Sequence, residues 1–135
     1  MNKEILIICR GGGDLATGIV HRLFRAGYQV LILETAEPAA IRRQVSFCEA
    51  VYEGTATVEG VTAERIYTAK KQAVEEVLQR GRIPLLVDPD GRSIEVLKPD
   101  VVVDAIIAKK NLGTYKEMAP LVIGIGPGFV AGKDG

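Results

Sequence analysis

Three consecutive glycines and an aspartate form the segment of the chain with the clearest chemical meaning. In Gly11-Gly12-Gly13-Asp14-Leu15-Ala16 the spacing fits the G-x-G-x-x-A pattern of dinucleotide-binding corners. Gly11 permits a tight turn, Gly13 lets a pyrophosphate approach the backbone, and the small Ala16 lets a helix pack against the preceding strand. The N-terminus of that helix adds unpaired N–H groups and a partial positive charge. The corner therefore has the shape of a phosphate site.

An acidic residue follows at the distance that such corners use. Glu34 ends the next apolar segment, roughly 20 residues after the glycines. A carboxylate there accepts hydrogen bonds from an adenosine ribose and repels a 2′-phosphate. The pattern therefore favours NAD over NADP. The alternative is that the glycines only make a turn and that Glu34 is a solvated strand end.

Two charged neighbours leave the role of the corner open. Asp14 stands in the first helical turn, where a carboxylate favours the helix dipole and can cap the helix. Alternatively, Asp14 partly takes the place of a phosphate and weakens dinucleotide binding. Arg10 precedes the glycines and can bind phosphate through two N–H groups or pair with Asp14.

Other polar residues follow apolar segments further along the chain. Asp104 is closely followed by Lys109, Lys110 and Asn111, which can hold an anionic group such as a phosphate or a pterin substituent, or form a solvated helix or loop. Asp88 precedes Pro89-Asp90-Gly91 and is expected to be a turn residue.

These residues are positioned by alternating strand and helix patterns. Short continuous apolar runs are typical of strands that are buried on both faces of a parallel sheet. The chain is therefore predicted to be α/β, with a Rossmann-like, doubly wound, mainly parallel sheet and helices on both faces. Strands are expected at residues 5–9, 29–33, 50–52, 84–87, 101–103 and 121–125, helices at 14–26, 38–43 and 68–80, and a loop or small hairpin at 53–60.

Length and composition exclude several classes of protein. The 135 residues suit one domain, 1–135, with 47% hydrophobic and 25% charged residues. Lys plus Arg equals Asp plus Glu at 17 each, which argues against nucleic-acid and anionic-membrane partners. The apolar runs are too short to cross a membrane. Cys9 and Cys48 form no CxxC pair, which favours a reducing, cytoplasmic location without a zinc site.

Several segments read together resemble a known family. RGGGDLATGIVHRLFRAG, VSFCEAVYEGTATVEGV, LVDPD, KPDVVVDAIIAKKNLGT and APLVIGIGPGF are similar to the YqeB-type accessory proteins of selenium-dependent molybdenum hydroxylases, which are related to the XdhC group. The resemblance implies a Rossmann-like domain that handles or modifies the molybdenum cofactor, a phosphate-bearing pterin, for a molybdenum hydroxylase apo-enzyme. It also implies that relatives continue beyond the GIGPGF segment, so that this chain is truncated relative to its family.

The sequence supports more than one function. The first is an accessory protein that binds or modifies a molybdopterin nucleotide; the alternatives are an NAD-dependent oxidoreductase domain and a non-catalytic nucleotide-binding regulatory module. A homodimer is expected because symmetric dimers are the commonest soluble oligomers. No catalytic residue or metal site is assigned. The candidate cofactor contacts are Arg10, Gly11, Gly12, Gly13, Asp14, Leu15, Glu34, Asp104, Lys109, Lys110 and Asn111.

Overall fold

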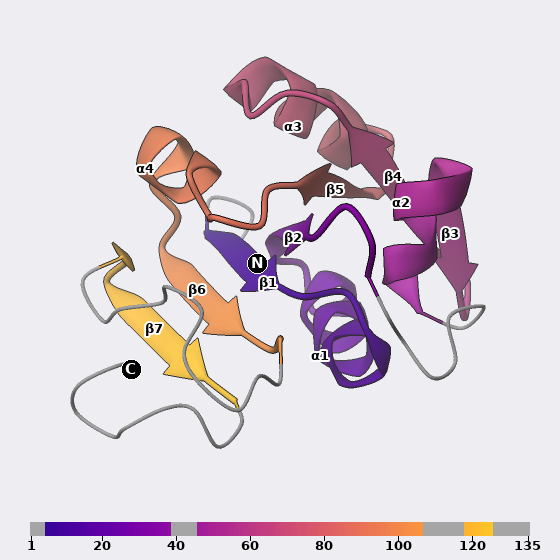
Figure 1. The fold of residues 1–135 in the computed structure, drawn as a ribbon, viewed down its shortest axis with the longest axis horizontal. Helices are drawn as coiled ribbons and strands as arrows, with labels where there is room; N and C mark the ends of the chain where they lie inside the picture. The colour runs from indigo at the N-terminus through magenta and orange to yellow at the C-terminus, as the bar shows by residue number, and fades with distance from the viewer. Residues whose placement is uncertain (1–4, 39–45, 107–117, 126–135) are drawn as a thin grey trace.

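A seven-stranded sheet organises the part of the chain that the computed structural model describes, namely residues 5–38, 46–106 and 118–125 (Figure 1). The strand order is β3-β4-β5-β2-β1-β6-β7. Its strands are β1 (Leu6–Arg10), β2 (Gln29–Glu34), β3 (Thr55–Val58), β4 (Val61–Ile66), β5 (Ile83–Val87), β6 (Val101–Asp104) and β7 (Leu121–Gly124).

Pairing in this sheet is parallel except between β3 and β4, which form an antiparallel hairpin. The loop or small hairpin expected at 53–60 contains β3 and the turn after it, whereas the sequence patterns did not predict β4. The central strands β1 and β2 are buried along most of their length. This burial on both faces explains why their sequences are continuously apolar rather than alternating.

Helices cover both faces of the sheet. The helix α1 (Asp14–Arg25), the 3₁₀ turn η2 (Phe47–Glu49) and α2 (Ala50–Glu53) pack on one face, where Ala16, Val20 and Phe47 join the core. The helices α3 (Lys71–Gln79) and α4 (Ser93–Leu97) pack on the other. The fold is a Rossmann-like α/β fold, as the alternating pattern predicts.

Some local predictions differ from the structure. The strand expected at 50–52 is wrong, because α2 occupies this segment and ends at Gly54, which has a φ of +84°. A short apolar run buried on one side does not distinguish helix from strand. The helix expected from Thr68 begins at Lys71, and the Thr68 hydroxyl accepts a hydrogen bond from the Lys70 N–H instead. The helix α4 was not predicted.

A short helix was expected at 38–43. Of this segment, only Pro38 belongs to the described residues. Within the three described ranges, no helix has both the length and the apolar character needed to traverse a bilayer.

Candidate functional site

At the end of β1, the backbone turns and passes close to another segment of the chain, and this geometry requires a glycine at position 11. Its φ is +109°, a region that favours glycine. A Cβ here would lie 3.0 Å from the Ala105 carbonyl oxygen, and the Gly11 N–H donates to the Leu33 carbonyl at 2.7 Å. Gly11 is therefore a structural residue, held between β2 and the segment that follows β6.

Packing of η2 against the corner requires Gly12. A Cβ on Gly12 would lie 3.2 Å from the Cys48 backbone nitrogen and 3.3 Å from Ile32 Cγ2. The Gly12 carbonyl accepts hydrogen bonds from the Cys48 N–H at 2.9 Å and from the Thr17 hydroxyl at 3.2 Å. The 3₁₀ turn thus leaves no room for a side chain.

The surroundings of Gly13 are different. Its φ of −76° suits any residue. In the described part of the structure, apart from Gly13 and its two chain neighbours, no heavy atom lies within 4 Å of the position that a Cβ would occupy. Steric packing in the described structure therefore does not require a glycine here. The open space lies where the motif brings a phosphate closest to the backbone.

The N-terminus of α1 faces the same space. Gly13 is its N-cap residue and supplies no side chain, so the first-turn N–H groups have no partner within the helix. The Asp14 carboxylate does not cap the helix but accepts a hydrogen bond from the Ser46 hydroxyl at 2.5 Å. Leu15 is 51% exposed beside it. The helix end retains its donors and its partial positive charge for a ligand.

Glu34 lies at the end of β2, directly beside the glycines. One carboxylate oxygen accepts the Gly12 N–H at 2.6 Å and the other accepts the Thr35 N–H at 2.8 Å. These bonds fix the side chain, and each oxygen has lone-pair capacity left for a ligand hydroxyl. Glu34 is thus placed to contact a ribose, while its charge opposes a second phosphate at that point.

Arg10 and Asp104 lie across from each other at the ends of β1 and β6. They are Cα partners in the parallel ladder and are only 1% and 2% exposed. Arg10 donates to the Pro89 carbonyl at 2.9 Å, and Asp104 accepts the Ile106 N–H at 3.1 Å. Arg10 alternates with Cys9 along β1, so it projects toward the α3 and α4 face rather than toward α1.

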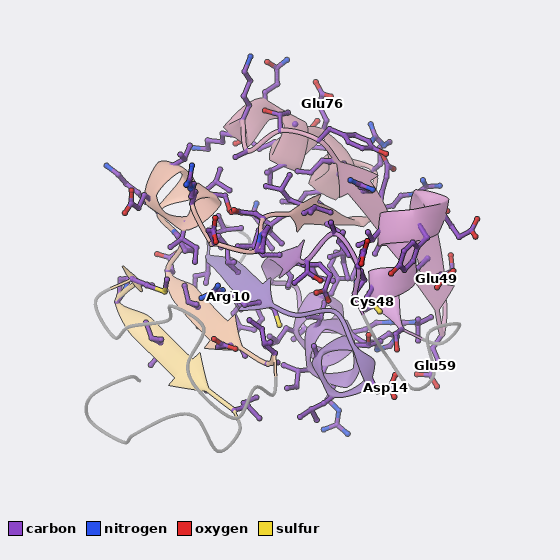
Figure 2. The ribbon with its side chains drawn as sticks, viewed as in Figure 1. Arg10, Asp14, Cys48, Glu49, Glu59 and Glu76 are labelled. Carbon is purple, nitrogen blue, oxygen red and sulfur yellow. The ribbon has the colours of Figure 1, made fainter. Side chains whose placement is uncertain are left out.

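Figure 2 shows the consequence, with Arg10 near β6 and Asp14 well apart from it at α1. The guanidinium contacts the turn after β5, and the Asp14 carboxylate contacts Ser46.

A cavity of about 340 Å³ lies at the carboxyl ends of β1, β2 and β5. Ligands of open parallel sheets bind at this edge, where the strand order reverses. The order reverses between β1 and β6, beside this cavity, and Ile106 from the segment after β6 contributes to the lining. Both apolar and charged residues line the cavity. Its lining includes Leu33, Pro89 and Ile106, together with Thr35, Arg10, Glu34, Asp88 and Asp90.

A larger cavity, of about 600 Å³, lies at the opposite edge of the sheet. Its lining includes Phe24 and Tyr28 near the end of α1, and Leu78 on α3. It lies at the opposite end of α1 from the glycine corner. We therefore assign the candidate site to the smaller cavity at the carboxyl edge, whose lining includes Arg10 and Glu34 but none of the three glycines.

Asp88 has the turn role expected from the sequence. Its two carboxylate oxygens accept hydrogen bonds from the Arg92 N–H, the Ser93 N–H and the Ser93 hydroxyl, at 2.6 to 3.2 Å. These bonds organise the start of α4. They also hold the turn that carries Pro89 and Asp90 against the cavity.

Both cysteines are buried and protonated at neutral pH. Burial, with smaller contributions from Asp104 and Glu34, raises the pKa of the Cys9 thiol from 9.0 to about 12. Burial also raises the pKa of Cys48 to about 11, helped by Glu34 and by two further carboxylates, Glu49 and Asp14. Neither thiol is a nucleophile under these conditions. In the described ranges, no group of three or more His, Cys, Asp or Glu residues is arranged to hold a metal ion.

Contacts from the segment after β2 were not foreseen from the sequence. Ser46, Phe47 and Cys48 bond to Asp14, Thr17 and Gly12, respectively. No local motif marks these residues, because the contacts depend on how η2 returns to α1. The predicted contacts Lys109, Lys110 and Asn111 lie outside the described residues.

Comparison with known proteins finds a similar chain in Escherichia coli K12. The two are 50% identical over 129 residues, which cover 96% of this chain and 24% of the relative. This chain is similar to "Uncharacterized protein YqeB". It spans about a quarter of the length of that curated relative. No protein-family model matches the chain, and no solved structure matches it.

Proposed function

We propose that this chain is the nucleotide-binding, Rossmann-like part of an accessory protein for maturation of a selenium-dependent molybdenum hydroxylase. The observation that carries nucleotide binding is Gly13. It has ordinary backbone angles and open space at its Cβ position, which leaves its backbone accessible to a phosphate, as the motif requires.

Three other features support the same binding mode. The first-turn N–H groups of α1 are available for phosphate oxygens. Glu34 is fixed next to Gly12 and can accept hydrogen bonds from ribose hydroxyls. The cavity beyond Glu34 has about 340 Å³, a size suited to a small ligand. Phosphates bind at the corner, the ribose at Glu34, and the remainder of the ligand in the cavity.

The maturation role rests on the motif resemblance, with the similarity to YqeB supporting the assignment of those motifs. A molybdopterin nucleotide and NAD both carry phosphates and a ribose, so the same corner suits either. The partner is then the apo-form of a molybdenum hydroxylase in the cytoplasm. An NAD-dependent oxidoreductase is the alternative that the same site allows.

Calorimetric titration with NAD, NADP, AMP and a molybdopterin nucleotide tests this proposal. Binding of the pterin nucleotide in preference to NAD supports the maturation role. Tight NAD binding with no pterin binding supports the oxidoreductase or regulatory alternatives. Absence of binding by all four compounds overturns nucleotide binding itself.

A matched pair of variants tests the location of the site. Gly13→Asp places a carboxylate where the phosphate approaches and is expected to weaken binding by about tenfold or more. Gly18→Asp introduces the same charge into the same helix, at an exposed position that also has open space around its Cβ. Equal affinity in the two variants would place the nucleotide elsewhere.

A further inference from the structure

The cavity beyond Glu34 has a charge that is unsuited to phosphate. The carboxylates of Glu34, Asp88 and Asp90 line it together with the guanidinium of Arg10. This excess of negative charge favours a neutral ligand portion that offers hydrogen-bond donors. The apolar side chains of Leu33, Pro89 and Ile106 suit the faces of a planar ring.

The order of the strands sets the orientation of a ligand. The glycine corner follows β1, Glu34 ends β2, and Asp90 follows β5, and these three strands are consecutive in the sheet. The distance from β1 to β5 is roughly 10 Å, two strand spacings. A nucleotide with its phosphates at Gly13 and its ribose at Glu34 therefore directs its base toward Asp90.

Asp90 differs from the other two carboxylates of the cavity. Glu34 binds two backbone N–H groups, and Asp88 binds the start of α4. The Asp90 carboxylate has Arg92 as its charged neighbour at 3.9 Å, and both side chains are largely exposed. Such an exposed pair is weak, so the Asp90 carboxylate can accept a hydrogen bond from a ligand at little cost.

We propose that Asp90 selects the base of the bound nucleotide by accepting a hydrogen bond from an exocyclic amino group. The proposal rests on the nucleotide binding proposed above and adds a specificity-determining residue to that site. Bases with an amino group on the six-membered ring, as in adenine and cytosine, are accepted. The corresponding oxo bases, hypoxanthine and uracil, present a carbonyl oxygen that the carboxylate repels.

Two pairs of mononucleotides test the proposal. AMP and IMP differ by an amino-to-oxo change, as do CMP and UMP, and the two pairs distinguish a purine ligand from a pyrimidine ligand. In the wild-type protein, we expect the affinity for the better-bound amino nucleotide to be higher than the affinity for its oxo counterpart by roughly tenfold or more. In Asp90→Asn this ratio should fall toward one, because an amide can also donate to the oxo group.

Glu95→Gln is the matched control. Glu95 is exposed on α4, close in sequence to Asp90 but outside the cavity lining, and its loss should leave the ratio unchanged. The exposed position of Asp90 makes a folding defect unexpected, and circular dichroism of the variant checks this.

The possible failures are distinguishable. If mononucleotides bind the wild-type protein without amino-over-oxo preference, or if the preference persists in Asp90→Asn, the role of Asp90 is refuted while nucleotide binding stands. If none of the four mononucleotides binds, and neither NAD nor a molybdopterin nucleotide binds, both the proposed function and this inference fail.

Discussion

Two neighbouring glycines of the corner have opposite structural requirements. Gly12 is enclosed by Cys48 and Ile32, whereas Gly13 faces open space. We expect Gly12→Ala to lower the free energy of unfolding by about 1–3 kcal/mol, because the added methyl group overpacks the contact with η2. Gly13→Ala should cost less, at most about 1 kcal/mol, because no neighbour is overpacked and only the poorer N-cap preference of alanine opposes the change. Urea denaturation of both variants measures the difference, and an equal loss in both would contradict the geometry.

The buried thiols make stability depend on alkaline pH. The folded-state pKa values are about 12 for Cys9 and about 11 for Cys48, against 9.0 for an unperturbed thiol. Above pH 9 the unfolded chain releases these protons while the folded chain keeps them. The free energy of unfolding therefore falls as the pH rises from about 9 toward 11, and no such loss occurs below pH 9.

Comparison of wild type with Cys9→Ser and Cys48→Ser isolates this effect from the titration of tyrosines and lysines. Urea midpoints at pH 8, 9 and 10 should fall more steeply in the wild type than in either variant. Parallel pH profiles would show that the thiols contribute nothing.

Sequence patterns identified some residue roles better than others. The turn role of Asp88 follows from the Pro-Asp-Gly segment behind it. The contact of Glu34 with the Gly12 N–H was not predictable, because motif spacing places the carboxylate near the corner without stating which donor it meets. The direction of Arg10 likewise depends on the strand's register and face.

At the scale of elements, Thr17 joins α1, the glycine corner and η2. Its buried hydroxyl donates to the Gly12 carbonyl at 3.2 Å and accepts the Phe47 N–H at 2.9 Å. Thr17→Val keeps the shape but leaves both backbone groups without this partner. We expect a loss of about 1–3 kcal/mol in the free energy of unfolding from the buried Phe47 N–H, which loses its acceptor, because the Gly12 carbonyl keeps its bond to the Cys48 N–H.

Thr17→Ser retains the hydroxyl and is the control for this substitution. It should cost less than Thr17→Val, since it removes only a methyl group. Chemical denaturation measures both, and a serine variant as unstable as the valine variant would assign the effect to packing instead of hydrogen bonding.

Long elements were predicted more accurately than short ones. The helix expected at 14–26 ends only one residue later than α1. The agreement is close because the apolar stripe of a twelve-residue helix has a clear period. The four residues of α2 and the three of η2 are too short to show a period. Their conformation is determined by burial of Phe47, Ala50 and Val51 on the sheet, which is a tertiary effect.

At the scale of the whole molecule, the alternation of strands and helices was sufficient to predict a mainly parallel sheet covered on both faces. The order of the strands within the sheet was not predicted. The hairpin β3–β4 adds two strands beyond β5 at one side, and β7 lies beside β6 at the other. Strand order depends on which crossover each loop makes, and local sequence does not specify it.

Protection of backbone amides should follow this strand order. The central strands β1 and β2 are flanked on both sides, whereas β3 and β7 lie at the ends of the described sheet. Native-state hydrogen exchange is expected to be slowest in β1 and β2 and faster by at least about tenfold in β3. Uniform exchange across these strands would show that the sheet opens only as a single unit.

The central position of β1 also has a consequence for the order in which the chain folds during synthesis. The Leu6 N–H donates to an Asp100 carboxylate oxygen 94 positions away, and Ile8 pairs with Val102. One side of β1 therefore lacks its partner until β6 has left the ribosome. Contacts of such long sequence separation slow folding, and an unpaired β1 edge is a template for pairing with another nascent chain. A chaperone that shields β1 until β6 emerges would therefore benefit this protein more than one that acts after β6 has been made.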